Sequence, residues 1–246
     1  DIVISNPGLV GNCVIFFLGK IFKKKVIGTV YAEELTTVIY GSSLKSKIKN
    51  TLVKNFYKFA YCFISVCDLS KIILKKYNCR QNNYILPPAG KLQTNFKIFN
   101  NPSRILSVGR LIKRKGFDNL IKTAGKLKKK IPNLRLNIIG YGPELNNLKI
   151  LIKEIKAEEY ISILTNINRE KLNDLYSKSD LFVLGNYLLK NGDTEGCPVV
   201  FIEAMSYMLP IIGGVGGGVE NAINNGDNGF LVQADNLNEL YDKIYL

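Results

Sequence analysis

Short apolar runs alternate with longer amphipathic stretches along almost the whole chain. Short runs rich in Val, Ile, Leu and Phe are typical of buried strands, and strands that alternate with helices indicate a parallel sheet. We predict strands over Asp1–Ser5, Lys25–Tyr31, Cys62–Val66, Asn83–Leu86, Arg104–Gly109, Leu134–Gly140, Ile161–Leu164, Asp180–Leu184, Leu209–Gly214 and Gly229–Val232.

The stretches between these strands predict the helices. They are expected over Gly8–Phe22, about Ser43–Tyr61, Leu69–Lys76, Phe117–Lys130, Glu144–Ile155, Asn168–Lys178, Pro198–Tyr207 and Val219–Asn224. The polar stretch Asn95–Ser103 contains a proline, has no clear period and is the best linker candidate. The sequence therefore predicts an α/β protein with two Rossmann-like doubly wound lobes, residues 1–100 and residues 101–246.

The composition removes several classes of function. No apolar run reaches the ~18–20 residues that a membrane-spanning helix needs. The chain has five cysteines, no CxxC pair and no histidine, which argues against a metal or redox site and removes imidazole catalysis. The thiols are expected to be reduced and structural in a cytoplasmic protein. Chemistry must then use carboxylates, Lys and Arg, Tyr or backbone groups.

The charge is unevenly distributed along the chain. The net charge is +14, and residues 1–100 hold 15 Lys and Arg against 4 Asp and Glu, whereas residues 101–246 hold 19 against 16. A field of one sign favours an anionic surface such as lipid headgroups, nucleic acid or an acidic polymer. A solvated face produced by composition bias is an equal alternative. Nucleic acid is disfavoured, because no recognisable module interleaves aromatic residues with the charges.

Four loops follow predicted strands at their carboxyl ends, where doubly wound sheets bind ligands. The loop Gly109–Gly116 supplies Arg110, Lys113, Arg114 and Lys115, and Arg and Lys suit phosphate oxygens. The loops Gly140–Glu144 and Gly213–Glu220 are both rich in glycine, and the glycines of Gly213–Glu220 indicate either a backbone cradle for phosphate or a tight turn. The fourth loop precedes the helix that is predicted to begin at Pro198.

This fourth loop opens the segment EGCPVVFIEAMSYMLPII, which carries Glu195 and Glu203 at the two ends of an apolar run. Pro198 suits a first helical turn, and the N–H groups near Gly196, Cys197 and Val199 would favour an anion. Glu203 lies further along, inside an otherwise apolar helix, and needs a partner. A sugar diol and an internal ion pair are the two alternatives.

Taken together, five segments resemble the nucleotide-sugar-binding domain of the retaining group 1 (family 4) glycosyltransferases, which have the GT-B fold. They are VGRLIKRKG, IIGYGPE, LYSKSDLFVL, EGCPVVFIEAMSYMLPII and GGVGGGVENAINNGDNGFLV, within residues 104–232. The spacing of Glu195 and Glu203 matches the EX7E motif of that family. Residues 1–100 resemble only the later part of its acceptor domain. The resemblance therefore implies an N-terminally truncated fragment whose first lobe is incomplete.

The resemblance also implies roles for single residues. Arg110 and Lys115 would hold the donor diphosphate without a metal, Glu203 would bond the nucleotide ribose, and Glu195 would contact the donor sugar and steady its oxocarbenium-like state. The implied catalytic residues are Arg110, Lys115 and Glu195. The implied donor-binding residues are Gly109, Arg110, Lys115, Gly140, Glu195, Gly196, Cys197, Pro198, Val199 and Glu203.

The implied activity is retaining, metal-independent hexosyl transfer in polysaccharide biosynthesis. It would run from a nucleotide-diphosphate sugar to a glycan or lipid-linked acceptor, without a cofactor. The basic residues 1–100 would then contact an anionic membrane from its cytoplasmic side. Nucleic acid is not an expected partner.

Three positions depart from the family pattern: Tyr31 stands where many relatives have His, Gly185 where Ser is usual, and Leu209 where Gly usually precedes Pro. A degenerate, non-catalytic nucleotide-sugar-binding module is therefore the alternative. A nicotinamide dehydrogenase is disfavoured, because no GxGxxG opens a βαβ unit followed by an acidic residue.

Overall fold

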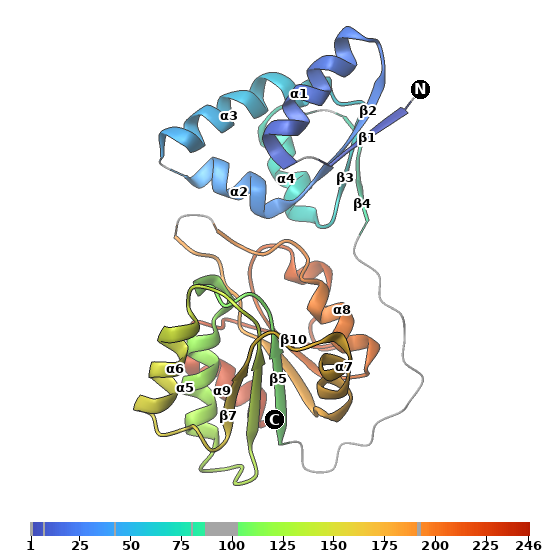
Figure 1. Ribbon diagram of the computed structural model, residues 1–246. Helices are drawn as coiled ribbons and strands as arrows, with labels where there is room; N and C mark the ends of the chain where they lie inside the picture. The colour runs from blue at the N-terminus through green and yellow to red at the C-terminus, as the bar shows by residue number, and fades with distance from the viewer. Residues whose placement is uncertain (1, 7, 42, 80, 87–102, 191–192) are drawn as a thin grey trace. The chain divides into compact units, whose positions relative to one another are not determined.

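The computed structural model describes residues 2–6, 8–41, 43–79, 81–86, 103–190 and 193–246. The chain forms two compact units (Figure 1). One contains Asp1–Pro88 together with Leu188–Cys197, and the other contains Ala89–Tyr187 together with Pro198–Leu246. The loop Leu188–Cys197 thus groups with the first unit, although the sequence assigned it to the second lobe. Of the predicted linker Asn95–Ser103, the structure describes only Ser103. Its place as the boundary between the lobes therefore stays a prediction.

The first unit is built on a four-stranded parallel sheet in the order β1-β2-β3-β4. Its elements are β1 (Ile2–Ser5), α1 (Gly8–Ile21), β2 (Lys25–Val30), α2 (Ala32–Tyr40), α3 (Leu44–Phe56), the 3₁₀ turn η1 (Tyr57–Phe59), β3 (Cys62–Ser65), α4 (Asp68–Lys76) and β4 (Asn83–Ile85). The four predicted strands are confirmed with slightly shorter bounds. Helix α2 was not predicted, because its run Thr36, Thr37, Val38 and Ile39 is β-branched and disfavours a helix locally.

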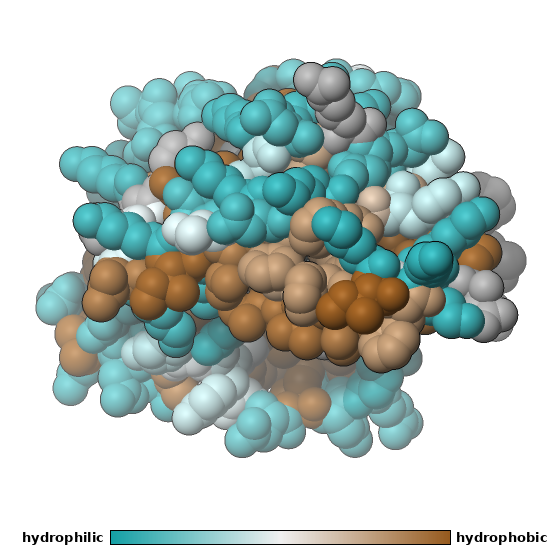
Figure 2. All heavy atoms as spheres, turned by 90° about the horizontal axis from the view of Figure 1, so that it is seen from above, coloured by the Kyte–Doolittle hydropathy of each residue, from teal (hydrophilic) through white to brown (hydrophobic). Residues whose placement is uncertain are grey.

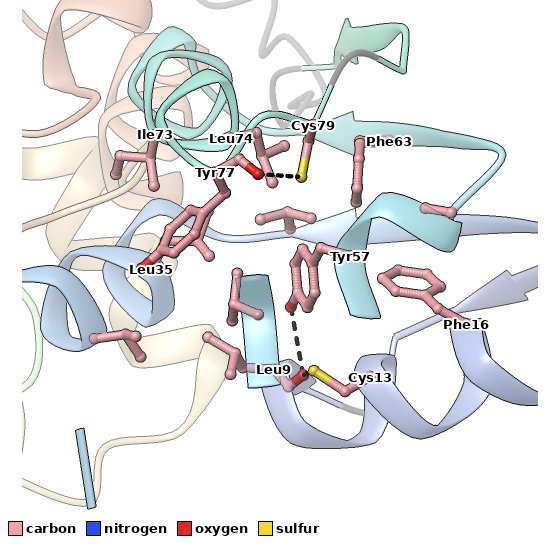
Figure 3. Close-up of a cluster of buried hydrophobic side chains, with 14 of the residues drawn as sticks. Leu9, Cys13, Phe16, Leu35, Tyr57, Phe63, Ile73, Leu74, Tyr77 and Cys79 are labelled. Carbon is pink, nitrogen blue, oxygen red and sulfur yellow. Dashed lines mark hydrogen bonds between the residues drawn. The ribbon is translucent and has the colours of Figure 1, made fainter. Parts of the chain in front are cut away.

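The core of the first unit forms where α1 packs on the sheet (Figure 3). The rings of Phe16 and Tyr57 meet edge to face with centroids 5.2 Å apart, and Phe63 completes the aromatic group. A Cβ at Gly28 on β2 would overlap the Phe16 ring, so glycine is required there. The Tyr57 hydroxyl donates to the Leu9 carbonyl oxygen over 3.4 Å, which gives this buried polar group a partner.

The second unit contains a six-stranded parallel sheet in the order β10-β9-β8-β5-β6-β7. Its elements are β5 (Arg104–Val108), the 3₁₀ turn η2 (Lys113–Lys115), α5 (Phe117–Leu127), β6 (Arg135–Ile139), α6 (Leu145–Glu154), β7 (Ile161–Leu164), α7 (Arg169–Lys178), β8 (Leu181–Leu184), α8 (Val199–Ser206), β9 (Ile211–Gly214), the 3₁₀ turn η3 (Val219–Asn221), β10 (Phe230–Val232) and α9 (Leu237–Tyr245). Helices α5, α6 and α9 cover one face of the sheet, and α7 and α8 the other (Figure 1). This is the doubly wound α/β architecture that the sequence predicts.

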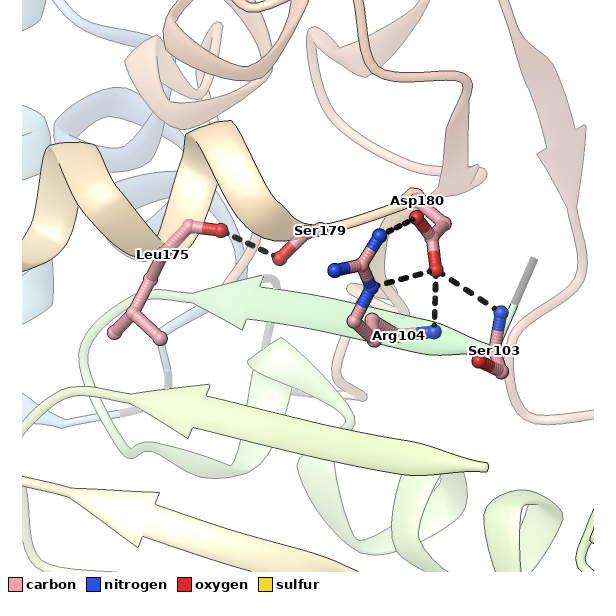
Figure 4. Close-up of polar contacts among 5 residues, drawn as sticks. All are labelled: Ser103, Arg104, Leu175, Ser179 and Asp180. Atoms are coloured by element: carbon pink, nitrogen blue, oxygen red, sulfur yellow. Dashed lines mark hydrogen bonds and ion pairs between the residues drawn. The ribbon is translucent and has the colours of Figure 1, made fainter. Parts of the chain in front are cut away.

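Strand β5 lies between β6 and β8, so the strand order reverses at β5. Ligands of doubly wound sheets bind at such a switch point, beyond the carboxyl ends of the strands. At the opposite edge of the sheet, where the strands begin, Arg104 of β5 forms an ion pair with Asp180, which directly precedes β8 (Figure 4). The Asp180 carboxylate also accepts the backbone N–H groups of Ser103 and Arg104, at 3.1 and 2.9 Å.

In the second unit, one helical prediction needs correction and one helix was missed. The segment predicted as a helix over Val219–Asn224 forms only the 3₁₀ turn η3. Helix α9 was not predicted, although its start carries a recognisable cap: the Asn236 side chain accepts the N–H groups of Asn238 and Glu239.

Candidate functional site

The loop after β5 is held against the loop after β6. The Gly109 N–H donates to the Ile139 carbonyl oxygen over 3.0 Å, and Leu111 exchanges backbone hydrogen bonds with Tyr141 and Glu144, both 3.0 Å long. A Cβ at Gly140 would overlap the Gly109 carbonyl oxygen. Gly140 therefore lets the two loops meet backbone to backbone, whatever else they bind.

The same loop is also held on its other side, towards β8. The Tyr187 N–H donates to the Arg114 carbonyl oxygen over 3.0 Å. A short loop that is anchored on both sides in this way holds its backbone in a fixed position. Such rigidity favours recognition, because little freedom is lost when a ligand binds.

Lys115 and Arg110 occupy different positions on this loop. Lys115 is 7% exposed. The aliphatic part of its side chain lies beside Gly109, since a Cβ at Gly109 would be 3.6 Å from Lys115 Cε. Arg110 is exposed. Lys113 is engaged elsewhere, since its ammonium group pairs with Asp118 of α5 over 2.8 Å. The structure thus brings Gly109, Lys115 and Gly140 together and places Arg110 on the same loop.

Glu195, Gly196 and Cys197 belong to the first compact unit, whereas Arg110 and Lys115 belong to the second. Glu195 is buried, with 8% exposure. Burial, with a smaller contribution from Cys67, raises the pKa of the Cys197 thiol to about 11. This thiol is therefore neutral at physiological pH and is a poor nucleophile. A contact of these residues with a donor stays a prediction.

Helix α8 begins at Val199, and Pro198 is its N-cap rather than its first helical residue. In the described part of the chain, no side chain caps this end of α8. Uncapped N–H groups at the start of a helix favour an anion. The predicted role of Pro198 and Val199 thus has a suitable local geometry, and binding of a donor there stays a prediction.

Glu203 on α8 has partners that the sequence did not identify. Its Oε1 accepts Arg169 Nη1 over 2.8 Å, and its Oε2 accepts the Tyr176 hydroxyl over 3.1 Å. Both partners lie on α7. Of the two alternatives for this carboxylate, the ion pair is therefore present, and the sugar diol stays a prediction. Burial, followed by the nearby Glu203 charge, raises the pKa of the Tyr176 hydroxyl well above its usual range.

The signal for these partners was only partly visible in the sequence. The start of α7 was predicted from Asn168, and the Asn168 side chain does accept the Lys171 N–H over 2.8 Å. Helical spacing places Arg169 and Tyr176 on one face of α7. Nothing in the pattern says that this face lies against Glu203 on α8.

The glycine-rich loop after β9 forms a tight turn. The Gly216 N–H donates to Glu220 Oε1 over 3.2 Å, and Gly217 has a positive φ of 76°. A Cβ at Gly214 would overlap the Asn186 carbonyl oxygen. Of the two interpretations of this loop, the tight turn is thus observed. Within the described residues, no group of three His, Cys, Asp or Glu side chains is arranged to hold a metal ion.

The comparison with known proteins decides the family. The family model described as "Glycosyl transferases group 1" matches residues 91–246. The chain belongs to this family. The group 1 glycosyltransferase match covers the whole second sheet and the loops at its carboxyl edge.

Three relatives illustrate the similarity. An uncharacterized glycosyltransferase of Haemophilus influenzae is 37% identical over 55% of this chain and 36% of its own length. The putative colanic acid biosynthesis glycosyltransferase WcaL of Escherichia coli is 23% identical over 90% of this chain and 57% of its own. The crystal structure of the pneumococcal O-GlcNAc transferase GtfA in complex with UDP and GlcNAc has a TM-score of 0.76 at 21% identity, and the match covers 99% of this chain and 49% of that one.

The group 1 glycosyltransferase described here thus spans between about a third and just over half of the length of these relatives. Its α/β architecture with parallel sheets matches that of GT-B neighbours. None of the described helices is both long enough and apolar enough to cross a membrane.

Proposed function

We propose that the complete protein transfers a hexose from a nucleotide-diphosphate sugar to a glycan or lipid-linked acceptor, with retention and without a metal ion. The observation that carries the proposal is the doubly anchored loop Gly109–Gly116. It presents Arg110 and Lys115 at the switch point of the sheet in a group 1 glycosyltransferase. Residues 101–246 act as the donor lobe, and residues 1–100 contribute to the acceptor lobe.

The two cations have a defined task in this reaction. Cleavage of the donor bond leaves negative charge on the diphosphate, and fixed positive groups lower the barrier by stabilising that charge. Arg110 offers a planar fork of donors, and Lys115 offers a compact charge. Together they supply what a divalent cation supplies in other transferases.

The remaining site residues act on the rest of the donor. Glu203 accepts the ribose hydroxyls, Glu195 contacts the sugar, and the start of α8 at Pro198 and Val199 faces an anionic group. Gly109, Gly140, Gly196 and Cys197 also have donor-binding roles in this proposal. The relative solved with UDP and GlcNAc and the relative named for colanic acid biosynthesis support a nucleotide-sugar donor and a polysaccharide product.

The test is a donor screen on the complete protein. UDP- and GDP-sugars are offered with radiolabelled hexose, transfer is measured by product capture, and the anomeric configuration of the product is read by NMR. Transfer with retention supports the proposal. Binding of the nucleotide sugar without any transfer, over a panel of acceptors, favours the non-catalytic binding module. Transfer with inversion overturns the proposed mechanism.

A second part of the proposal concerns the outer surface of α1. The first unit exposes a set of large apolar side chains on this helix and just after it: Val10, Val14, Phe17, Leu18, Ile21 and Phe22. Figure 2 shows a band of apolar surface bordered by hydrophilic side chains. Exposed apolar patches of this kind mark interaction sites.

The charges beside this helix favour an anionic membrane as its partner. Lys20, Lys23, Lys24 and Lys25 cluster at the end of α1, and the Lys20 ammonium lies 4.1 Å from the centre of the Phe59 ring. Apolar and aromatic side chains next to lysines suit the boundary between headgroups and acyl chains. The protein therefore acts at the cytoplasmic face of the membrane, where a lipid-linked acceptor is presented.

A further inference from the structure

Both oxygens of the Glu203 carboxylate are held by one neighbouring helix. Arg169 Nη1 lies 2.8 Å from Oε1, and the Tyr176 hydroxyl lies 3.1 Å from Oε2. The two donors are two turns apart on α7, so they face α8 together. The carboxylate is thus fixed in orientation at both ends by a single element.

The two donors differ in how firmly they are placed. Tyr176 is fully buried, and its ring stacks on Tyr207 with centroids 5.2 Å apart and on Phe182 with centroids 6.0 Å apart. Packing therefore fixes the position of its hydroxyl group. The Arg169 side chain is 62% exposed, so it adds charge to the contact while remaining adaptable.

The arrangement leaves acceptor capacity on Glu203. An ionised carboxylate offers about four lone-pair sites, and Arg169 and Tyr176 use one on each oxygen. The Glu203 side chain is 24% exposed, so a ligand can reach it. One unused site on each oxygen matches two neighbouring hydroxyl donors, which is the chemistry of a ribose 2′,3′-diol.

We propose that Arg169 and Tyr176 are positioning residues that orient Glu203 for the two ribose hydroxyls of the donor nucleotide. This inference rests on the proposed function of Glu203. Without these donors, the carboxylate can rotate away, and the preference for a ribose over a deoxyribose falls. Neither residue needs to touch the substrate itself.

The experiment measures this preference in the complete protein. UDP and GDP are first compared by calorimetry, and the tighter of the two is then titrated beside its 2′-deoxy form. Wild type should prefer the ribonucleotide by about tenfold or more, since a hydrogen bond to a charged group is worth about 1.5–3 kcal/mol. Tyr176→Phe and Arg169→Ala should each lower the preference several-fold and leave binding of the deoxynucleotide nearly unchanged.

Two further variants separate the role of Glu203 itself from the role of the hydroxyl group that contacts it. Glu203→Gln should abolish the preference. Tyr207→Phe is the matched control, because it removes a hydroxyl group from the ring stacked on Tyr176 and leaves the donors to Glu203 intact. It should keep the preference of the wild type. If Tyr176→Phe unfolds, which a thermal melt reveals, the exposed Arg169→Ala variant decides the question.

The outcomes are distinguishable. If Glu203→Gln retains the ribose preference, the proposed role of Glu203 is wrong and this inference fails with it. If Glu203→Gln loses the preference while both α7 variants retain it, only the positioning role is overturned. If Tyr207→Phe loses the preference as strongly as Tyr176→Phe, the loss is not specific to the hydroxyl that contacts Glu203, and the inference is again overturned.

Discussion

Gly116 lies directly against Gly185, so that a Cβ on Gly116 would overlap the Gly185 carbonyl oxygen. Gly116 also has a φ of 65°, in the left-handed region that glycine adopts without strain. Through this contact, the end of the loop Gly109–Gly116 packs against the residue that directly follows β8. Gly185 is one of the positions that depart from the family pattern, and a Cβ there would lie 3.3 Å from the Ala234 Cβ.

Gly116→Ala should therefore destabilise the protein more than a comparable substitution elsewhere. Gly226→Ala is the matched control, because Gly226 also has a positive φ, of 86°, but has open space around its Cβ position. The control bears only the conformational cost of about 1–2 kcal/mol. Gly116→Ala adds a steric cost of about 1–3 kcal/mol. Urea unfolding of both variants measures the difference, and equal losses would show that the Gly116–Gly185 contact relaxes without cost.

Arg110→Ala and Lys115→Ala should each remove most transfer activity of the complete protein. The expected cost is about 3 kcal/mol in the barrier, as for the loss of one preorganised donor. Lys113→Ala is the control, because Lys113 lies on the same loop but pairs with Asp118. Initial rates with saturating donor, together with circular dichroism of each variant, provide the measurement. Activity of either site variant within twofold of wild type would show that the diphosphate is held elsewhere.

A chelator should leave the transfer rate unchanged. The reason is that Arg110 and Lys115 provide the positive charge that the leaving diphosphate requires. Rates are compared before and after dialysis against EDTA, and again after Mg²⁺ or Mn²⁺ is restored. A strict requirement for either ion would contradict the metal-independent mechanism.

The ion pair between Arg104 and Asp180 should make stability depend on pH in the acid range. Burial alone would raise the pKa of Asp180, but hydrogen bonds from Arg104 and from the backbone of Ser103 and Arg104 outweigh it and lower the pKa. A carboxyl group whose pKa is lower in the folded state stabilises the protein above its unfolded pKa of about 3.9, and this contribution is lost as the pH falls through the folded pKa.

Asp180→Asn removes this titration and provides the comparison. Urea midpoints of wild type and variant are measured at pH 7, 5, 4 and 3. The difference in urea midpoint between wild type and Asp180→Asn should be constant from pH 7 to about pH 5. It should shrink below about pH 4, because only the wild type loses the stabilisation that ionised Asp180 provides. A difference that stays the same down to pH 3 would show that Asp180 does not titrate in this way.

The complete protein should bind anionic vesicles in a salt-reversible manner through the surface of α1. Each basic group near such a membrane contributes about 1 kcal/mol, and salt screens it within about a Debye length. Lys23→Glu combined with Lys24→Glu should abolish sedimentation with phosphatidylserine-containing vesicles. The control is Lys129→Glu with Lys130→Glu, the same charge change on the second unit. Equal binding to neutral and anionic vesicles would show that the lysines do not select the membrane, and no binding to either lipid would overturn the membrane role.

Much of the fold was predictable because strand and helix periods are local properties. The run over Ile161–Leu164 was predicted with the bounds that the structure shows, and Asn168 marked the start of α7. Such features depend on neighbours in sequence, which the pattern contains. The loops at carboxyl ends of strands followed from the same strands, and they placed Gly109, Arg110 and Lys115 on one loop.

The sequence by itself thus determined the order of the strands and of most helices, the loops that follow the strands and the family. Only the tertiary structure decided that Glu203 faces Arg169 and Tyr176, that residues Leu188–Cys197 group with the first unit, and that the outer face of α1 is exposed. Periodicity states which residues share a face of a helix. Which element covers that face depends on contacts between residues far apart in the chain, and a local pattern does not contain them.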